Sequence, residues 1–137
     1  MSFGNWHDKY SVNNAIIDEQ HKRLLHILFR MEKLVTKGNA TDGIVELLSD
    51  MSDYAQEHFK SEERYMARIG YPQLEKHQEL HSKYALQVLQ FTLEHLDDAP
   101  EHPREVLNFL THWWTEHILK VDMDYSKFAD KQFLSKM

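Results

Sequence analysis

The stretch from His58 to His81 contains two pairs of potential metal ligands at the spacing of one helix turn. His58 and Glu62 are four residues apart, and so are His77 and His81. Gly-Tyr-Pro at 70–72 separates the pairs and predicts a turn between two helices. Side chains at i and i+4 lie on one helix face, and both pairs continue rows of apolar residues. Two antiparallel helices would therefore aim three imidazoles and a carboxylate at one point, which predicts a metal site.

The rest of the chain decides how specific this pattern is. With ten histidines in the sequence, about one pair spaced like His77 and His81 is expected by chance. A histidine on an apolar helix face is also more often a hydrogen-bonded core residue than a metal ligand. The metal interpretation therefore requires that other helices send ligands to the same depth.

Length and composition predict one all-α domain over residues 1–137. Only four Gly and three Pro interrupt apolar residues that recur at helical spacing. The formal charge of −6 argues against nucleic acid or an anionic membrane as the main partner. The absence of cysteine excludes thiolate zinc sites, iron–sulfur clusters and thiol catalysis. No apolar run approaches the length of a membrane span, so we expect a cytoplasmic protein.

Three segments are expected: an N-terminal arm (1–17), a four-helix bundle (18–122) and a C-terminal segment with one short helix (123–137). The arm is too apolar for disorder and is expected to pack across the bundle. The loop between the third and fourth helices is placed at 97–103. Short connections between the helices predict an up-down-up-down bundle.

Capping residues give the expected helix ends. Asp18 is the expected N-cap of the first helix, and Gly38 lies just past its end. The second helix is expected to start at Thr41 or Asp42 and to end near Arg68. Gly70 would close that second helix, and Pro72 suits the first turn of the third.

The four helices bring seven potential ligands to one end of such a bundle. They are His21, His58, Glu62, His77, His81, His117 and Asp122. Asp122 follows His117 by five residues, which on a straight helix rotates it by roughly 140°. Either the helix loosens there, as π-bulges do, or it ends and Asp122 turns inward. Seven ligands are too many for one zinc ion and suit two metals that share carboxylate bridges.

At this point the sequence resembles the hemerythrin family, and specifically a single-domain bacteriohemerythrin. The resemblance covers nearly the whole chain and includes Trp6 and Tyr10 in the arm. It is carried by four motifs: IDEQH (17–21), HFKSE (58–62), HQELH (77–81) and HILKVD (117–122).

The resemblance implies a role for each ligand. His77, His81 and His117 would hold one iron, and His21 and His58 the other, which would keep an open position for dioxygen. Glu62 and Asp122 would bridge the two irons together with an oxo or hydroxo group. Leu24, Phe59, Trp113 and Leu119 match apolar pocket positions of the family, and a pocket without an acid should slow autoxidation. The implied function is reversible dioxygen binding for storage, delivery or sensing, with an oxygen-consuming enzyme as a possible partner.

Two other classes of function remain open. One is a diiron enzyme on the same scaffold, namely a peroxidase, an iron oxidase or iron store, or a nitric-oxide handler. The other is a bundle that a metal merely stabilises. Five neutral imidazoles with two carboxylates carry less negative charge than the ferritin-type set of four carboxylates and two histidines. That donor set should stabilise Fe(II) and favours carrying dioxygen over oxidising a substrate.

Two further expectations concern the surface. We expect a monomer, because no helix sequence shows a second apolar stripe. The histidines outside the site should be dispensable for metal binding. They are His7, His26, His95, His102 and His112.

Overall fold

The computed structural model describes residues 6–37, 43–96 and 102–135, and every regular element in these ranges is helical. The elements are η1 (Asp8–Tyr10), α1 (Ala15–Lys37), α2 (Ile44–Ile69), α3 (Leu74–Leu96), α4 (His102–His112), the π-helix η2 (Trp113–Val121) and α5 (Asp122–Ser135). This content confirms the all-α prediction.

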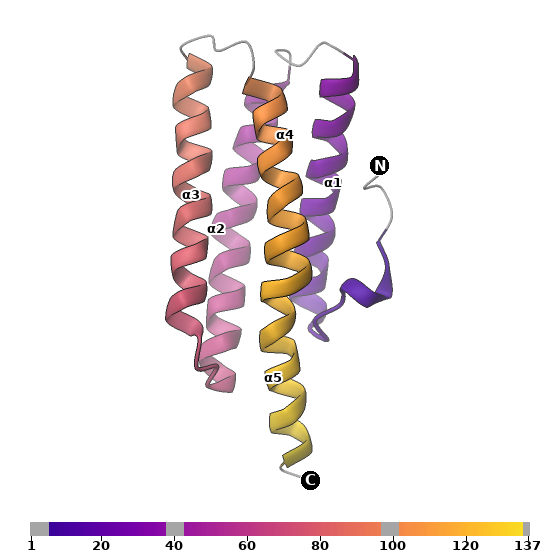
Figure 1. Cartoon of the computed structure of the whole chain (residues 1–137), viewed down its shortest axis with the longest axis vertical. Helices are drawn as coiled ribbons and strands as arrows, with labels where there is room; N and C mark the ends of the chain where they lie inside the picture. Colours follow the sequence, from indigo (N-terminus) through magenta and orange to yellow (C-terminus); the bar gives the residue numbers. More distant parts are fainter. Residues whose placement is uncertain (1–5, 38–42, 97–101, 136–137) are drawn as a thin grey trace.

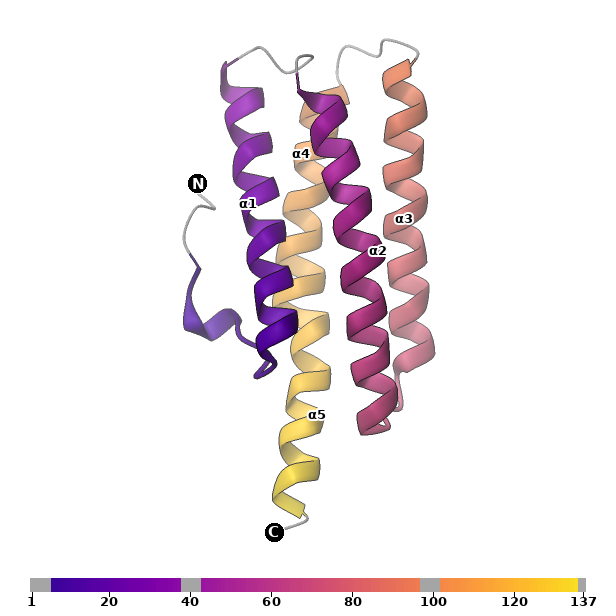
Figure 2. The ribbon, with the colours of Figure 1, turned by 180° about the vertical axis from the view of Figure 1, so that it is seen from behind.

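The four long helices form an antiparallel bundle (Figures 1 and 2). α1 contacts α2 and α4, α2 contacts α3, and α3 contacts α4, as up-down-up-down topology requires. The C-terminal segment is helical as predicted. It continues the fourth helix without a break, so that α5 projects past the ends of the other helices (Figure 1). None of the helices in the described ranges is long and apolar enough to cross a membrane.

The start of α1 differs from the prediction. The helix begins at Ala15, and the side chain of Asn14 accepts a hydrogen bond from the Ile17 N–H at 3.1 Å. Asp18, the predicted N-cap, lies inside the first turn. Its carboxylate instead accepts the Ser11 hydroxyl at 2.6 Å and the Val12 N–H at 2.9 Å. Asp18 therefore fastens the arm to the helix, a role that helix-end signals do not predict.

The other helix ends follow from their capping residues. Gly70 closes α2 in the left-handed conformation with φ of 69°, as predicted. Pro72 lies in the turn before α3, which starts at Leu74, and not in the first turn of that helix as predicted. The prediction that the third loop extends to residue 103 is wrong, because α4 begins at His102. Proline is compatible with a first helical turn, where its missing N–H has no partner to lose. Gly38, Thr41, Asp42 and 97–101 lie outside the described residues.

Two apolar clusters enclose the level of the predicted ligands. The larger fills the part of the bundle on one side, and it includes Leu24, Tyr54 and Trp113. The smaller consists of Val12, Ile17, Met66 and Tyr125 and closes the other side. The arm contributes to both, since Trp6 and Tyr10 pack against the larger cluster and Val12 belongs to the smaller. The predicted packing of the arm is confirmed for its described residues.

One helix carries an apolar stripe on its outer face. Leu86, Leu89 and Leu93 on α3 are 65%, 54% and 55% exposed, at helical spacing. The premise that no helix has a second apolar stripe is therefore wrong for α3. The outer leucines were missed because the same helix also has an inward row of apolar residues. The monomeric state itself remains a prediction.

Candidate metal centre

A π-helix brings the last two candidate ligands onto one face. In η2 the backbone N–H of Asp122 donates to the carbonyl of His117, five residues earlier. The wider turn of a π-helix places residues i and i+5 on one face, as an α-helix does for residues i and i+4. His117 Nε2 therefore lies 3.0 Å from Asp122 Oδ1. Of the two predicted alternatives, the loosened helix is confirmed.

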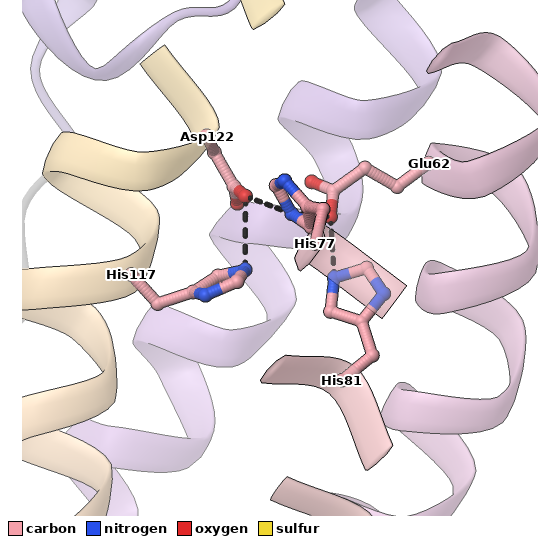
Figure 3. Close-up of side chains that lie close together, drawn as sticks. All are labelled: Glu62, His77, His81, His117 and Asp122. Carbon is pink, nitrogen blue, oxygen red and sulfur yellow. Dashed lines mark hydrogen bonds and ion pairs between the residues drawn. The ribbon is translucent and has the colours of Figure 1, made fainter. Parts of the chain in front are cut away.

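The seven predicted residues meet in two groups that could each hold a metal ion. One group contains Glu62, His77, His81, His117 and Asp122, and the other contains His21, His58, Glu62 and Asp122. Glu62 and Asp122 belong to both groups. All seven side chains are buried. Figure 3 shows the first group, whose side chains come from α2, α3, η2 and the start of α5 and point at one another.

Glu62 turns a different oxygen to each group. Its Oε1 lies 2.8 Å from His81 Nε2 and 3.1 Å from His77 Nε2. Its Oε2 lies 3.3 Å from His58 Nε2 and 3.6 Å from His21 Nε2. The carboxylate thus connects the three-histidine group with the two-histidine group.

Asp122 is divided in the same way. Its Oδ1 faces the three-histidine group, at 2.9 Å from His77 Nε2 and 3.0 Å from His117 Nε2. Its Oδ2 faces the two-histidine group, at 3.1 Å from His21 Nε2. Two carboxylates that each present one oxygen to each group form an arrangement that could bridge a pair of metal ions.

The unsatisfied atoms of the site fit a metal cofactor. The protein provides no well-aligned hydrogen bond for the Nε2 atoms of His21, His58, His81 and His117, nor for the two oxygens of Asp122. Buried polar atoms normally have partners, so a converging set without them needs another explanation. Imidazole nitrogens and carboxylate oxygens are ligands that iron, zinc and manganese accept.

The electrostatics of the imidazoles reflect the two carboxylates. Burial lowers the pKa of His21, but the facing carboxylates of Asp122 and Glu62 outweigh it and raise the pKa to about 9. The same balance raises the pKa of His77 to about 10. For His58, burial prevails over Glu62 and lowers the pKa. In the metal-free chain, protons on His21 and His77 therefore compensate the buried carboxylates.

The carboxyl groups respond in the opposite sense. Burial raises the pKa of Glu62 and Asp122, but the facing imidazoles outweigh it, chiefly His58 for Glu62 and His117 for Asp122. The pKa of both groups lies below its usual range, so both are ionised at neutral pH and available as ligands.

Three residues outside the predicted set hold the ligands in place. The Nδ1–H of His58 donates to Gln20 at 2.8 Å, because the Gln20 amide is itself oriented by a hydrogen bond to Ser61. The Nδ1–H of His81 donates to the carboxylate of Glu63 at 2.8 Å. The hydroxyl of Tyr125 donates to Glu62 Oε2 at 2.8 Å. These contacts leave both Nε2 atoms facing the site.

None of these three roles was predicted from the sequence. Glu63 lies off the apolar stripe of its helix, a position that predicts a solvated charge, but its carboxylate instead accepts the His81 N–H. The sequence signal that could have revealed two of the three residues is their position next to a candidate ligand. Gln20 directly precedes His21, and Glu63 directly follows Glu62. Side chains beside a ligand reach around the helix to a ligand on the next helix.

The predicted pocket residues are distributed over both groups. Leu24 is buried on α1, one turn from His21. Phe59 stacks on His81 and Trp113 on His117, each at a ring-centroid distance of 3.8 Å. Leu119 is partly buried against the larger core cluster. On the two-histidine side, Tyr54 stacks on His58 at 5.0 Å, which was not predicted.

The other histidines stand apart from the site where they are described. His7, His26 and His112 are exposed. The side chains of His95 and His102 lie outside the described residues. The dispensability of all five histidines stays a prediction.

A helical bundle with a buried histidine and carboxylate centre defines a metal-binding bundle protein. Comparison with known proteins identifies the family. The model of the hemerythrin HHE cation-binding domain matches residues 12–129, so the chain belongs to the hemerythrin family as a single domain. Membership and the buried donor set together indicate a metal cofactor.

Relatives cover nearly the same length. The chain is 32% identical to a bacteriohemerythrin of Clostridium acetobutylicum over 127 residues, which are 88% of this chain and 96% of that protein. It is 26% identical to a bacteriohemerythrin of Stenotrophomonas maltophilia, over 88% of this chain and 78% of the relative. A hemerythrin-like protein of Naegleria gruberi is 27% identical, over 88% and 89%.

Proposed function

We propose that this chain holds two iron ions and binds dioxygen reversibly, for storage, delivery or sensing. His77, His81 and His117 would hold one ion, His21 and His58 the other, and Glu62 and Asp122 would bridge the pair. When bound, two ferrous ions supply the electrons that make dioxygen binding possible. The observation that carries the proposal is the division of each carboxylate between the two groups.

The two-histidine group is the side where a ligand would bind. It contains four potential donors, whereas the three-histidine group contains five. With the same two bridges, the second ion would receive one protein donor fewer and could accept a small molecule. Apolar and aromatic side chains from the larger core cluster cover this level of the bundle and restrict water.

A diiron enzyme on the same scaffold is the second candidate. The observation that favours it is the phenol of Tyr125, which donates to Glu62 inside the centre. A phenol at that distance is an oxidisable group beside the bridging carboxylate. Against an enzyme stands the donor set, since five imidazoles with two carboxylates carry less negative charge than the ferritin-type set.

Absorption spectra of the reduced iron protein test the proposal. We expect a visible charge-transfer band on exposure to air, and we expect it to disappear on degassing with iron retained. A band that does not reverse on degassing, or substrate turnover at the expense of dioxygen, would favour the enzyme. Failure to bind two irons per chain would contradict both candidates.

A further inference from the structure

Four buried side chains form a layer next to the centre, on the side of the larger core cluster. Each helix contributes one residue a single turn from a candidate ligand: Leu24 follows His21 by three, Tyr54 precedes His58 by four, Tyr84 follows His81 by three and Trp113 precedes His117 by four. Residues at these spacings share a helix face with the ligand. All four are buried and belong to the larger core cluster. Three of them carry a hydrogen-bond donor.

The donors of this layer are not equally satisfied. The Tyr84 hydroxyl donates to the carbonyl of Met51 at 3.5 Å. The Tyr54 hydroxyl and the Trp113 Nε1–H are buried, and neither has a well-aligned hydrogen-bond partner. The indole N–H nevertheless lies near enough to the Tyr54 hydroxyl to lower its pKa. Buried donors without an acceptor are rare, and each needs a physical reason. Two in one layer next to a metal centre point to an acceptor that the protein itself does not supply.

Both donors are held beside the candidate ligands. The Tyr54 ring stacks on the His58 imidazole, with centroids 5.0 Å apart and planes at 17°. The Trp113 indole stacks on the His117 imidazole at 3.8 Å and 9°. The order of helix contacts puts α2 and the α4–η2 helix at opposite corners of the bundle. The two side chains therefore reach into the bundle axis from opposite sides.

Electrostatics support their proximity. Burial raises the pKa of the Tyr54 hydroxyl well above its usual value, and the Trp113 N–H opposes that rise. The carboxylates Glu62 and Asp122 also act on the Tyr54 hydroxyl. Tyr54 thus remains a neutral donor, close to both the indole N–H and the bridging carboxylates.

We propose that the Tyr54 hydroxyl and the Trp113 Nε1–H form a two-donor subsite that hydrogen-bonds a small acceptor ligand in the pocket of the two-histidine group. The ligand class is a diatomic or triatomic molecule with exposed lone pairs, namely dioxygen or an anion such as azide. This inference rests on the proposed function, because the ligand is held between the subsite and the metal. It also revises the expectation of a wholly apolar pocket.

Azide affinity of the oxidised iron protein tests the subsite. Tyr54→Phe removes the hydroxyl and keeps the ring, and Tyr84→Phe is the matched control in the same layer. We expect Tyr54→Phe to raise the Kd for azide about tenfold, since hydrogen bonds to charged groups are the stronger class. The control should change it less than about twofold. Trp113→Phe, which keeps an aromatic ring on His117, should weaken azide binding in the same direction as Tyr54→Phe.

Stability of the metal-free chain gives a second measurement that does not depend on iron. Removal of an unpaired hydroxyl should leave Tm unchanged or higher in Tyr54→Phe. Tyr84→Phe loses its hydrogen bond to Met51 and should lower Tm by roughly 2–6 °C. Equal losses in both variants would mean that the Tyr54 hydroxyl already has a structural partner, which overturns the proposal.

Different results would overturn the subsite alone and the proposed function as a whole. Unchanged azide affinity in Tyr54→Phe, with two irons per chain in wild type and variant, overturns the subsite and leaves the proposed function intact. That result would also be expected if the two donors held only a fixed water molecule. A wild-type chain that binds neither iron nor azide overturns the proposed function and this inference together.

Discussion

The two sides of the centre share their carboxylates and differ in everything that surrounds them. The three-histidine side has His81 anchored by an anionic partner, the Glu63 carboxylate. The two-histidine side has His58 anchored by a neutral amide, Gln20. Tyr54 stacks over that neutral side and leaves an unpaired hydroxyl. The three-histidine side therefore has an anionic partner on one of its imidazoles, and the two-histidine side is the one that we propose accepts a ligand.

The difference shows how a bundle with similar helices produces an asymmetric site. Partners of the Nδ1 atoms set the donor strength of the imidazoles. An anionic partner increases that strength, and a neutral amide increases it less. The asymmetry thus depends on residues next to the candidate ligands in sequence as well as on the unequal number of histidines on the two sides.

Removal of a shared carboxylate should have the largest effect on iron content, because each carboxylate faces both sides of the centre. Glu62→Ala and Asp122→Ala each remove an oxygen from both sides and leave buried imidazoles unpaired. We expect iron to fall from two per chain to one or none, as measured by elemental analysis. Glu57→Ala is the control, since Glu57 pairs with Arg23 on the surface. Two irons per chain in Glu62→Ala would contradict the bridging role.

The pH dependence of the metal-free chain is the next largest effect. The pKa of His21 rises to about 9 and that of His77 to about 10 in the folded state, from 6.5. A raised pKa stabilises the fold fully below the unfolded value, so this stabilisation is present below pH 6.5 and is lost as pH rises through 9 to 10. His58, whose pKa is lowered, contributes in the opposite sense below pH 6.5.

Thermal unfolding measures this effect directly. We expect Tm of the metal-free protein to decline between pH 7 and 10, and His77→Gln to reduce the decline. Metal binding should release protons, because the ligand imidazoles must be neutral. A Tm that rises over this interval would show that protonated His21 and His77 do not stabilise the fold.

Changing the hydrogen-bond partners of the His58 and His81 Nδ1 atoms should have a moderate effect on metal retention and on the reduction potential. These changes can also reverse which side has the anionic partner. Glu63→Gln makes the partner of His81 neutral, and Gln20→Glu makes the partner of His58 anionic. Glu63→Gln weakens the anchor of His81 and should reduce metal retention about 10- to 100-fold, as measured by competition with a chelator. Glu63→Gln should also raise the reduction potential of the centre, and Gln20→Glu should lower it. Equal potentials in both variants would indicate that the two sides do not differ through these contacts.

The smallest effect is expected from histidines outside both groups. His26→Ala and His112→Ala remove exposed side chains and should leave two irons per chain and a Tm shift near zero. Elemental analysis and thermal unfolding check both values. Loss of iron in either variant would mean that the helix carrying it presents another face to the site.

The candidate ligands could be predicted from sequence because helix periodicity places i and i+4 on one face, and because all four helices carry such residues at one depth. The position of Asp122 was left open, since a spacing of five fits a π-helix or a helix end equally well. Contacts between helices were beyond the sequence. Asp18 holds the arm, Gln20 and Glu63 hold imidazoles on other helices, and Tyr54 covers His58. Each of these roles depends on how helices are rotated against one another.

Mössbauer spectroscopy of the protein loaded with ⁵⁷Fe tests the central claim most directly, namely two irons in unequal surroundings joined by shared carboxylates. We predict two resolved signals of equal area, with both irons coupled into one centre in the oxidised protein. Glu63→Gln should shift one signal more than the other. A single uncoupled iron signal, or two that remain identical under all conditions, would contradict the account.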